Sequence, residues 1–313
     1  MCTRKFDLLI AFIFVATAAQ AAGVGELEIP ADANGPAIHA LVWTPCTTPP
    51  KDIRLEGPLI VPGVKDCPIS GEKLPLIVIS HGAGGSFTDH HDLAEVLADS
   101  GFVVVALTHP HDSAPLDKSW LVERPIDVKR LLDYVLRSSP AAAKIDPRRV
   151  GFFGYSRGGY TGLILAGAVP DYPILVKVWL PIAIWVFQND AATHQPGNDP
   201  RFKAFVLADP LTVFPDKDGL RKVTAPIQFW SSQSGGPGVL PEKIAAVATD
   251  VPARSELHRV LNSTHMSFLM PCSPSELKVA PAELCADPPG FDRAAFHKEF
   301  AAQVLAFFRK YLP

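Results

Sequence analysis

A G-x-S-x-G pentapeptide at residues 154–158 constrains this chain more than any other feature of its sequence. It follows the short apolar run Val150–Phe153 and precedes residues 159–166, whose small and apolar side chains suit a closely packed helix. A serine between a strand and a helix marks a nucleophile elbow, in which a strained turn raises the hydroxyl above the sheet edge. The pattern therefore predicts a nucleophilic Ser156. The alternative is a glycine-rich structural turn whose serine only caps the helix.

A second glycine-rich loop, H-G-A-G-G at residues 81–85, follows the continuous apolar run Leu76–Ser80. Acyl transfer through a serine creates an oxyanion, and two backbone N–H groups must already point at it. Glycines let the backbone approach a substrate because no Cβ stands in the way. We expect the amides of Ala83 and Arg157 to be the two donors. A plain strand-to-helix turn is the other interpretation of this loop.

A general base for the serine follows from chain order, which in this arrangement is serine, acid and then histidine. Of the ten histidines, His258, His265 and His297 lie after every plausible acid. His258 lies in an alternating segment typical of a strand, and His297 lies in the polar stripe of the last helix. His265 follows the last strand in a loop from which it can reach back over the serine, so we expect His265 to be the base.

The acid is less evident, because the strand that usually carries it, residues 226–230, is followed by no carboxylate before Glu242. The preceding strand, residues 205–208, has Asp209 at its carboxyl end. An aspartate there can orient the histidine from the neighbouring strand tip, so Asp209 is the expected acid. Its other possible role is to cap the following turn. The alternatives in the next loop are Asp216 and Asp218.

These motifs resemble those of an α/β-hydrolase of the dienelactone-hydrolase-like group, and the chain is particularly similar to the platelet-activating-factor acetylhydrolases. The resemblance runs from about Leu74 to the C-terminus and implies a serine hydrolase whose acid follows the strand before the usual one, as Asp209 does. True dienelactone hydrolases use a cysteine nucleophile, whereas this chain has Ser156, so lactone specificity is not implied. The resemblance rests on residues 81–85, 106–112, 154–159, 207–210 and 263–268.

The first residues are typical of an export signal, with a basic start, an apolar core at residues 8–16 and a small-x-small cleavage site at residues 19–21. The apolar core is too short to span a membrane. We therefore expect a signal peptide at residues 1–21, a mature chain that begins near Ala22, and a periplasmic or secreted location. A retained N-terminal anchor is the alternative.

The cysteines agree with export. Of the five, Cys2 would leave with the signal, and the others group along the chain as Cys46 with Cys67 and Cys272 with Cys285. An even number of cysteines in an exported chain indicates disulfides, and three connectivities are possible. We adopt the local pairing as an interpretation. Metal ligation is the poorer alternative because no C-x-x-C spacing occurs.

Strand-like and helix-like segments alternate from residue 76 onward. This alternation predicts an α/β fold with a mostly parallel central sheet covered by helices on both faces, which the resemblance identifies as the α/β-hydrolase fold. With 313 residues and 48% apolar content, residues 22–313 can bury the core of a single domain. The segment 171–199 begins with an unusually apolar stretch, which is either a buried excursion of the core or a lid.

Together these features predict an exported hydrolase that cleaves carboxylic esters through a Ser-His-Asp triad and an acyl-enzyme, without a metal or organic cofactor. The expected partner is a small-molecule ester. The net charge of −3 offers no basic surface for nucleic acid, and no transmembrane segment is expected after signal removal. The alternatives are an amide or peptide hydrolase with the same triad and a non-catalytic binding protein on the same scaffold. The sequence sets neither the acyl length nor the oligomeric state.

Overall fold

The computed structural model describes residues 21–55, 59–110, 112, 120–170, 197–214, 217–274, 276–278 and 280–313. The expected signal peptide therefore lies almost wholly outside the described residues. The same holds for most of the candidate lid at 171–199 and for Asp216.

Within the described residues, ten strands form one sheet in the order β10-β9-β8-β7-β5-β6-β2-β1-β4-β3. The six strands from β10 to β6 in that order are parallel, and β2 runs antiparallel to both β6 and β1. The mostly parallel sheet that the sequence predicts is confirmed. The strands are β1 (Ala21–Ile29), β2 (Ile38–Cys46), β3 (Lys51–Arg54), β4 (Ile60–Lys65), β5 (Leu74–Ser80), β6 (Val103–Leu107), β7 (Ile145–Tyr155), β8 (Phe202–Ala208), β9 (Ile227–Ser232) and β10 (Ser255–Val260).

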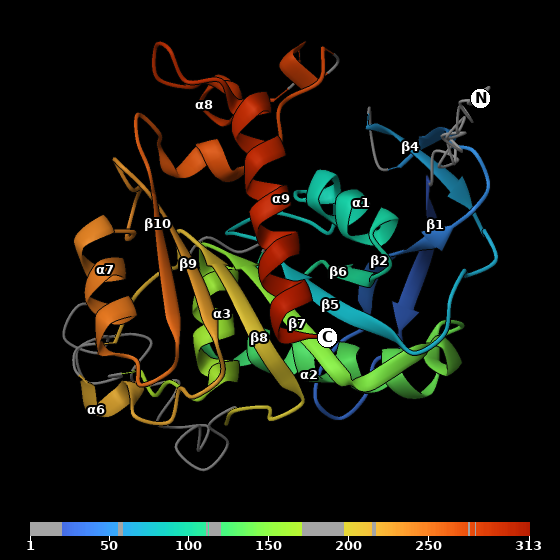
Figure 1. Ribbon diagram of the computed structural model, residues 1–313, viewed down its shortest axis with the longest axis horizontal. Helices are drawn as coiled ribbons and strands as arrows, with labels where there is room; N and C mark the ends of the chain where they lie inside the picture. The colour runs from blue at the N-terminus through green and yellow to red at the C-terminus, as the bar shows by residue number, and fades with distance from the viewer. Residues whose placement is uncertain are drawn as a thin grey trace, which may run out of the picture.

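Helices cover both faces of this sheet (Figure 1). α1 and α9 pack on one face, and α2, α3 and α7 pack on the other. The α-helices are α1 (His91–Asp99), α2 (Trp120–Arg137), α3 (Arg157–Ala166), α6 (Lys217–Leu220), α7 (Pro241–Asp250), α8 (Ala282–Cys285) and α9 (Arg293–Tyr311). Short 3-10 turns are η1 (Ala142–Lys144), η2 (His265–Phe268) and η3 (Glu276–Lys278).

The strands β5 and β6 are almost entirely apolar because both of their faces are buried. β5 illustrates this, since every one of its residues is buried. Successive side chains of a strand point to opposite faces, so Leu76 and Val78 join the core beneath α2 and α3, while Ile77 and Ile79 join the core beneath α1 and α9. The sheet thus lies between two apolar cores and contributes side chains to both.

The segment between β2 and β5 is not a plain connection. It contains β3 and β4, which extend the sheet beyond β1. β4 includes Pro62, which has no N–H to donate, and β4 pairs with β1 only at Val64 and Lys65. The proline therefore lies outside the part of β4 that pairs with β1, which is why the strand tolerates it.

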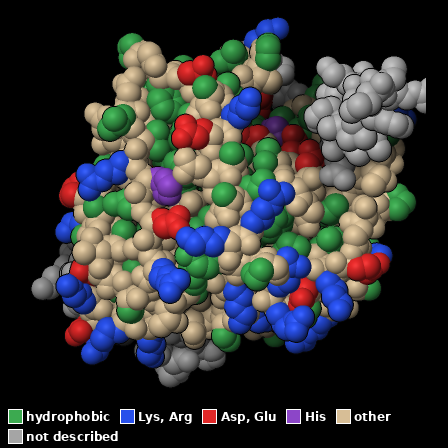
Figure 2. Space-filling view, viewed as in Figure 1, with side chains coloured by type: hydrophobic (Ala, Val, Ile, Leu, Met, Phe, Trp, Pro, Cys, Tyr) green, Lys and Arg blue, Asp and Glu red, His purple; other side chains and the backbone are tan. Residues whose placement is uncertain are grey.

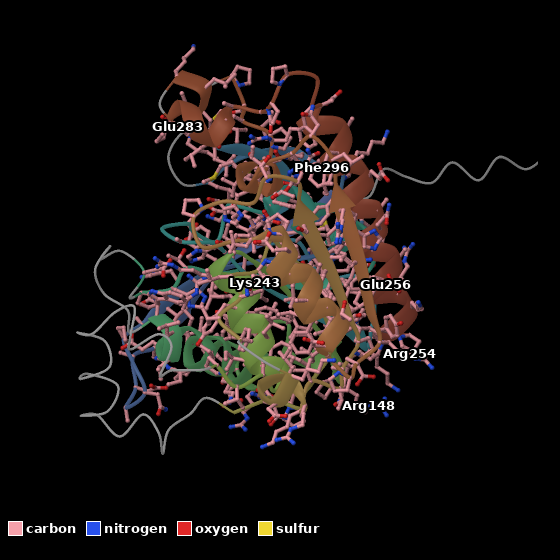
Figure 3. All side chains as sticks on the ribbon, turned by 90° about the vertical axis from the view of Figure 1, so that its left-hand side faces the viewer. Arg148, Lys243, Arg254, Glu256, Glu283 and Phe296 are labelled. Atoms are coloured by element: carbon pink, nitrogen blue, oxygen red, sulfur yellow. A yellow bond between two sulfur atoms is a disulfide. The ribbon has the colours of Figure 1, made fainter. Side chains whose placement is uncertain are left out.

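Two disulfides are present, and they follow the local pairing. Cys46–Cys67 joins the end of β2 to the segment after β4. Cys272–Cys285 closes a loop that begins after η2 and ends in α8. Figure 3 shows Glu283 of α8 and Arg148 of β7 at opposite ends of the molecule, so this loop lies at the end away from the start of β7.

The surface carries charges of both signs. On the face that α9 covers, Figure 2 shows acidic side chains interspersed among the Lys and Arg side chains. No helix of the described part of the chain is long and apolar enough to cross a membrane.

Candidate active site

Ser156 lies on the turn between β7 and α3, with backbone angles φ 55° and ψ −113°. A residue with a side chain rarely adopts a positive φ, so the turn is strained, as expected of a nucleophile elbow. The flanking glycines are required by close packing. A Cβ at Gly158 would clash with the carbonyl of Ser80, and a Cβ at Gly154 would clash with the backbone of Gly158. The glycine pattern thus allows the tight strand-to-helix turn that presents the serine.

The structure brings the three expected residues together in one chain of hydrogen bonds. Ser156 Oγ lies 3.0 Å from Nε2 of His265, and Nδ1 of His265 lies 3.0 Å from Oδ2 of Asp209. All three residues are buried. With the proton on Nδ1 held by the carboxylate, Nε2 is free to accept the serine proton. This geometry is the one that a serine nucleophile requires.

Asp209 is held by the neighbouring strand tip. It is completely buried and directly follows β8 with φ 41°. Ser232, the last residue of β9, donates to it twice: from the backbone N–H to Oδ1 at 2.7 Å and from the hydroxyl to Oδ2 at 2.6 Å. Sequence reasoning missed Ser232. The available signal was a serine at the strand end where the acid usually stands.

His265 begins the 3-10 turn η2, and its backbone is fixed on both sides. Its N–H donates to the carbonyl of Gly235 at 3.0 Å, and its carbonyl accepts from the Tyr155 hydroxyl at 2.9 Å. The Tyr155 ring also stacks on the imidazole, with 4.7 Å between ring centroids. Tyr155 directly precedes Ser156, so the segment that presents Ser156 also positions His265.

The two amides expected to bind an oxyanion flank the serine. A Cβ at Gly82 would lie 3.4 Å from the Ser156 Cβ, which places the 81–85 loop directly beside Ser156. Gly84 N–H already donates to Asp112, whereas the amide of Ala83 has no hydrogen-bond partner within the described residues. Arg157 is the first residue of α3, where a helix leaves its N–H groups without intrahelical acceptors.

A buried ionic cluster holds the 81–85 loop and Arg157 in place through Asp112. Asp112 accepts from Gly84 N–H and from the Arg157 guanidinium, each at 2.9 Å, and pairs with Arg124 at 2.9 Å. Burial would raise the pKa of Asp112, but Arg124 and the Gly84 N–H lower it overall, so the carboxylate stays charged. Asp112 therefore ties the 81–85 loop to the elbow. The sequence offered Asp112 only through the resemblance and gave no sign of Arg124.

Histidines extend this cluster beneath the loop. His81 Nδ1 donates to the carbonyl of Gly82, and its Nε2 accepts from the N–H of His109. Burial and the neighbouring Arg124 lower the pKa of His81 to about 3, so this ring is neutral. His109 contacts the carboxylate of Asp127, whose pKa burial raises to about 7.

A cavity of about 410 Å³ opens onto Ser156 and His265. Among the described residues that line it, the charged side chains other than His265 are the carboxylates Asp89 and Glu276. Burial raises the pKa of Asp89 to about 6. The disulfide-closed loop supplies part of the wall through Cys272. The apolar lining comes mainly from Met266, Leu269, Met270 and Leu284.

The other candidate residues lie away from this site. His258 is on β10, where its ring stacks on Trp230. Asp218 and Glu242 are exposed. His297 was expected in the polar stripe of the last helix, and that expectation is wrong, because the residue is only 6% exposed. No group of side chains suited to hold a metal ion occurs among the described residues.

Comparisons with known proteins agree with this architecture. Residues 56–125 match the family of platelet-activating factor acetylhydrolase, isoform II. That match covers β5 and the 81–85 loop, but it ends before Ser156. The chain therefore resembles these acetylhydrolases over part of its length. No curated protein is similar enough in sequence to match the chain.

A solved structure, the ferulic acid esterase from Streptomyces cinnamoneus, superposes with a TM-score of 0.63. The alignment covers 95% of this chain and 91% of the esterase, at 17% sequence identity. The chain has the α/β-hydrolase fold. Because 982 chains of solved structures match it, the fold by itself does not select a substrate.

Proposed function

We propose that this chain is an exported serine esterase that cleaves carboxylic esters. The observation that carries the proposal is the hydrogen-bonded series Ser156–His265–Asp209, which opens onto a cavity. The partial match to an acetylhydrolase family and the fold shared with an esterase support ester chemistry in particular.

The proposed reaction proceeds in two acyl-transfer steps. Ser156 Oγ attacks the ester carbonyl carbon while its proton passes to Nε2 of His265. The amides of Ala83 and Arg157 bind the oxyanion, and His265 then gives the proton to the departing alcohol. Water attacks the acyl-enzyme, gives a proton to His265, and the acid product leaves as Ser156 recovers its proton. Asp209 stays ionised throughout and stabilises the imidazolium.

The cavity favours esters whose bound groups are apolar and uncharged. Apolar side chains line most of it, and the carboxylates of Asp89 and Glu276 would repel an anionic substrate. A panel of p-nitrophenyl esters should therefore show turnover of neutral acyl groups and poor turnover of a matched ester with a terminal carboxylate. This panel also measures the acyl length that the site accepts.

Export is part of the same proposal. Both disulfides fit an oxidising compartment, where such bonds form and persist, and this supports the export that the N-terminal residues predict.

The decisive experiment is Ser156→Ala with purified, folded protein. Turnover of p-nitrophenyl butyrate should fall on the order of 10⁴-fold or more, and labelling by a fluorophosphonate probe should disappear. Ser138→Ala, at an exposed serine after α2, is the matched control and should keep the wild-type turnover and the probe labelling. If Ser156→Ala kept a tenth of the rate, the nucleophile would be misassigned. A matched anilide turned over as fast as the ester would favour an amide hydrolase.

A further inference from the structure

His297 joins the C-terminal helix to the turn that carries His265. It lies on α9, and its Nδ1 is 2.6 Å from Oδ2 of Asp92 on α1. Its Nε2 is 3.1 Å from the backbone carbonyl of Ser267 in η2, two residues after His265. One buried imidazole on α9 therefore contacts two other elements, α1 and η2, and η2 holds the proposed catalytic base.

Both partners of His297 are hydrogen-bond acceptors. A carboxylate oxygen and a backbone carbonyl have no proton to offer, so each ring nitrogen must carry its own hydrogen. A neutral imidazole has only one N–H and can satisfy only one of these contacts. The geometry therefore requires the imidazolium form, paired with the carboxylate of Asp92.

The charges around His297 fit this assignment. Burial would raise the pKa of Asp92, but its hydrogen bond from His297 lowers the pKa overall, so the carboxylate is ionised. Burial lowers the pKa of His90 to about 3, so that ring is neutral. His91 pairs with Glu95. On α9, Arg293 is already bound to Asp287.

The turn η2 depends on a small number of contacts. Thr264 and Ser267 form a capping box, in which each side chain bonds to the other's backbone N–H. The Ser267 hydroxyl also donates to Asp287, and the Ser267 carbonyl accepts from His297. A shift of this turn would move the His265 ring away from Ser156, because the turn carries the ring and the ring lies only 3.0 Å from Ser156 Oγ.

We propose that His297, as an imidazolium paired with Asp92, is a positioning residue that holds the η2 turn and thereby His265. The role of His265 as the base rests on the proposed function. Without the second N–H of His297, the Ser267 carbonyl would lose its donor and the turn would lose one of its supports. The rate of acyl transfer should consequently fall when this hydrogen bond is removed.

The first test is direct and independent of catalysis. Two-bond ¹H–¹⁵N correlation spectra of the mature protein at pH 7 should show both ring nitrogens of His297 protonated. A His297 ring with a single N–H at pH 7 would overturn the proposal, whether or not the protein hydrolyses esters.

The second test is kinetic. In His297→Gln the amide cannot bridge both acceptors as an imidazolium does, so kcat should fall about ten-fold while KM changes less than about two-fold. Asp92→Asn keeps an oxygen acceptor but removes the charge that pairs with the imidazolium, so kcat should fall in this variant too, with KM little changed. Asp92→Asn takes the place of His297→Gln in this test if His297→Gln does not fold.

The matched control is His39→Gln, at an exposed histidine on β2. It should keep the wild-type kcat and KM. A wild-type kcat in folded His297→Gln would overturn the positioning role. A protein without any Ser156-dependent ester hydrolysis would instead overturn the proposed function and leave the spectroscopic result to decide the state of His297.

Discussion

Two residues of the proposed triad have backbone conformations that side chains rarely adopt. Ser156 has φ 55° and Asp209 has φ 41°. Such conformations cluster at functional sites, where the surrounding structure holds them in place. Ser156 could be predicted because its flanking glycines encode the turn. Asp209 could be inferred only from its strand end, since its contacts with Ser232 arise when the tips of β8 and β9 meet in the fold.

The acid can be tested at the same scale. Asp209→Asn keeps the size of the side chain but favours the wrong tautomer of His265, so kcat should fall by up to about 10⁴-fold. Asp218→Asn, at an exposed aspartate in α6, is the matched control and should retain activity. Rates should be compared for folded, disulfide-bonded proteins. Near-wild-type activity in Asp209→Asn would remove this residue from the triad.

Ser232 provides a second, smaller prediction. Its hydroxyl is 2.6 Å from Oδ2 of Asp209, the same oxygen that faces His265. Ser232→Ala removes this hydrogen bond to a charged group, so kcat should fall about ten-fold with KM little changed. Ser231→Ala is a close control, because the Ser231 hydroxyl is also buried but donates to the carbonyl of Ser232 instead. Equal losses in both variants would indicate damage to β9 rather than to the triad.

At the scale of elements, the sequence was most informative where burial is complete. β5, β6 and the second half of β7 are apolar runs, so their alternation with helices predicted the sheet. The sequence was least informative at edges and on helix faces. β3 and β4 are short and mostly exposed, and β4 contains a proline. His297 looked like a surface residue because its partners, on α1 and η2, are distant in sequence.

The two disulfides offer a comparison between elements. Cys272–Cys285 closes the loop that forms part of the cavity wall, whereas Cys46 and Cys67 do not line this cavity. The double change Cys272→Ser with Cys285→Ser should raise KM for apolar esters about five-fold, with a smaller effect on kcat, because the triad lies outside the loop. The change Cys46→Ser with Cys67→Ser should lower stability by about 2–4 kcal/mol and leave KM unchanged. Equal KM values in the two variants would show that the loop does not contribute to substrate binding.

At the scale of the whole molecule, arginines fasten both ends of the described chain to the sheet and its helices. Arg130 of α2 donates to Asp32 and to the carbonyl of Pro30, just after β1. Arg149 of β7 donates to the carbonyl of Leu312, just after α9. The terminal elements are therefore part of the domain rather than appendages. The sequence could not show this, because each contact joins residues far apart in the chain.

The last prediction concerns export. If the chain is cleaved after Ala21, β1 loses only its first residue and its pairing with Cys46, while the pairing of Ala22 with Pro45 and the rest of the ladder remain. Mass spectrometry of the protein from its native host should find a first residue at Ala22 and no cysteine that alkylates without reduction. The same sample alkylated after reduction is the control and should gain a label on each of Cys46, Cys67, Cys272 and Cys285. Labels on all four cysteines before reduction would contradict the oxidising compartment. A protein that keeps residues 1–21 would instead indicate a retained anchor, with the disulfides intact.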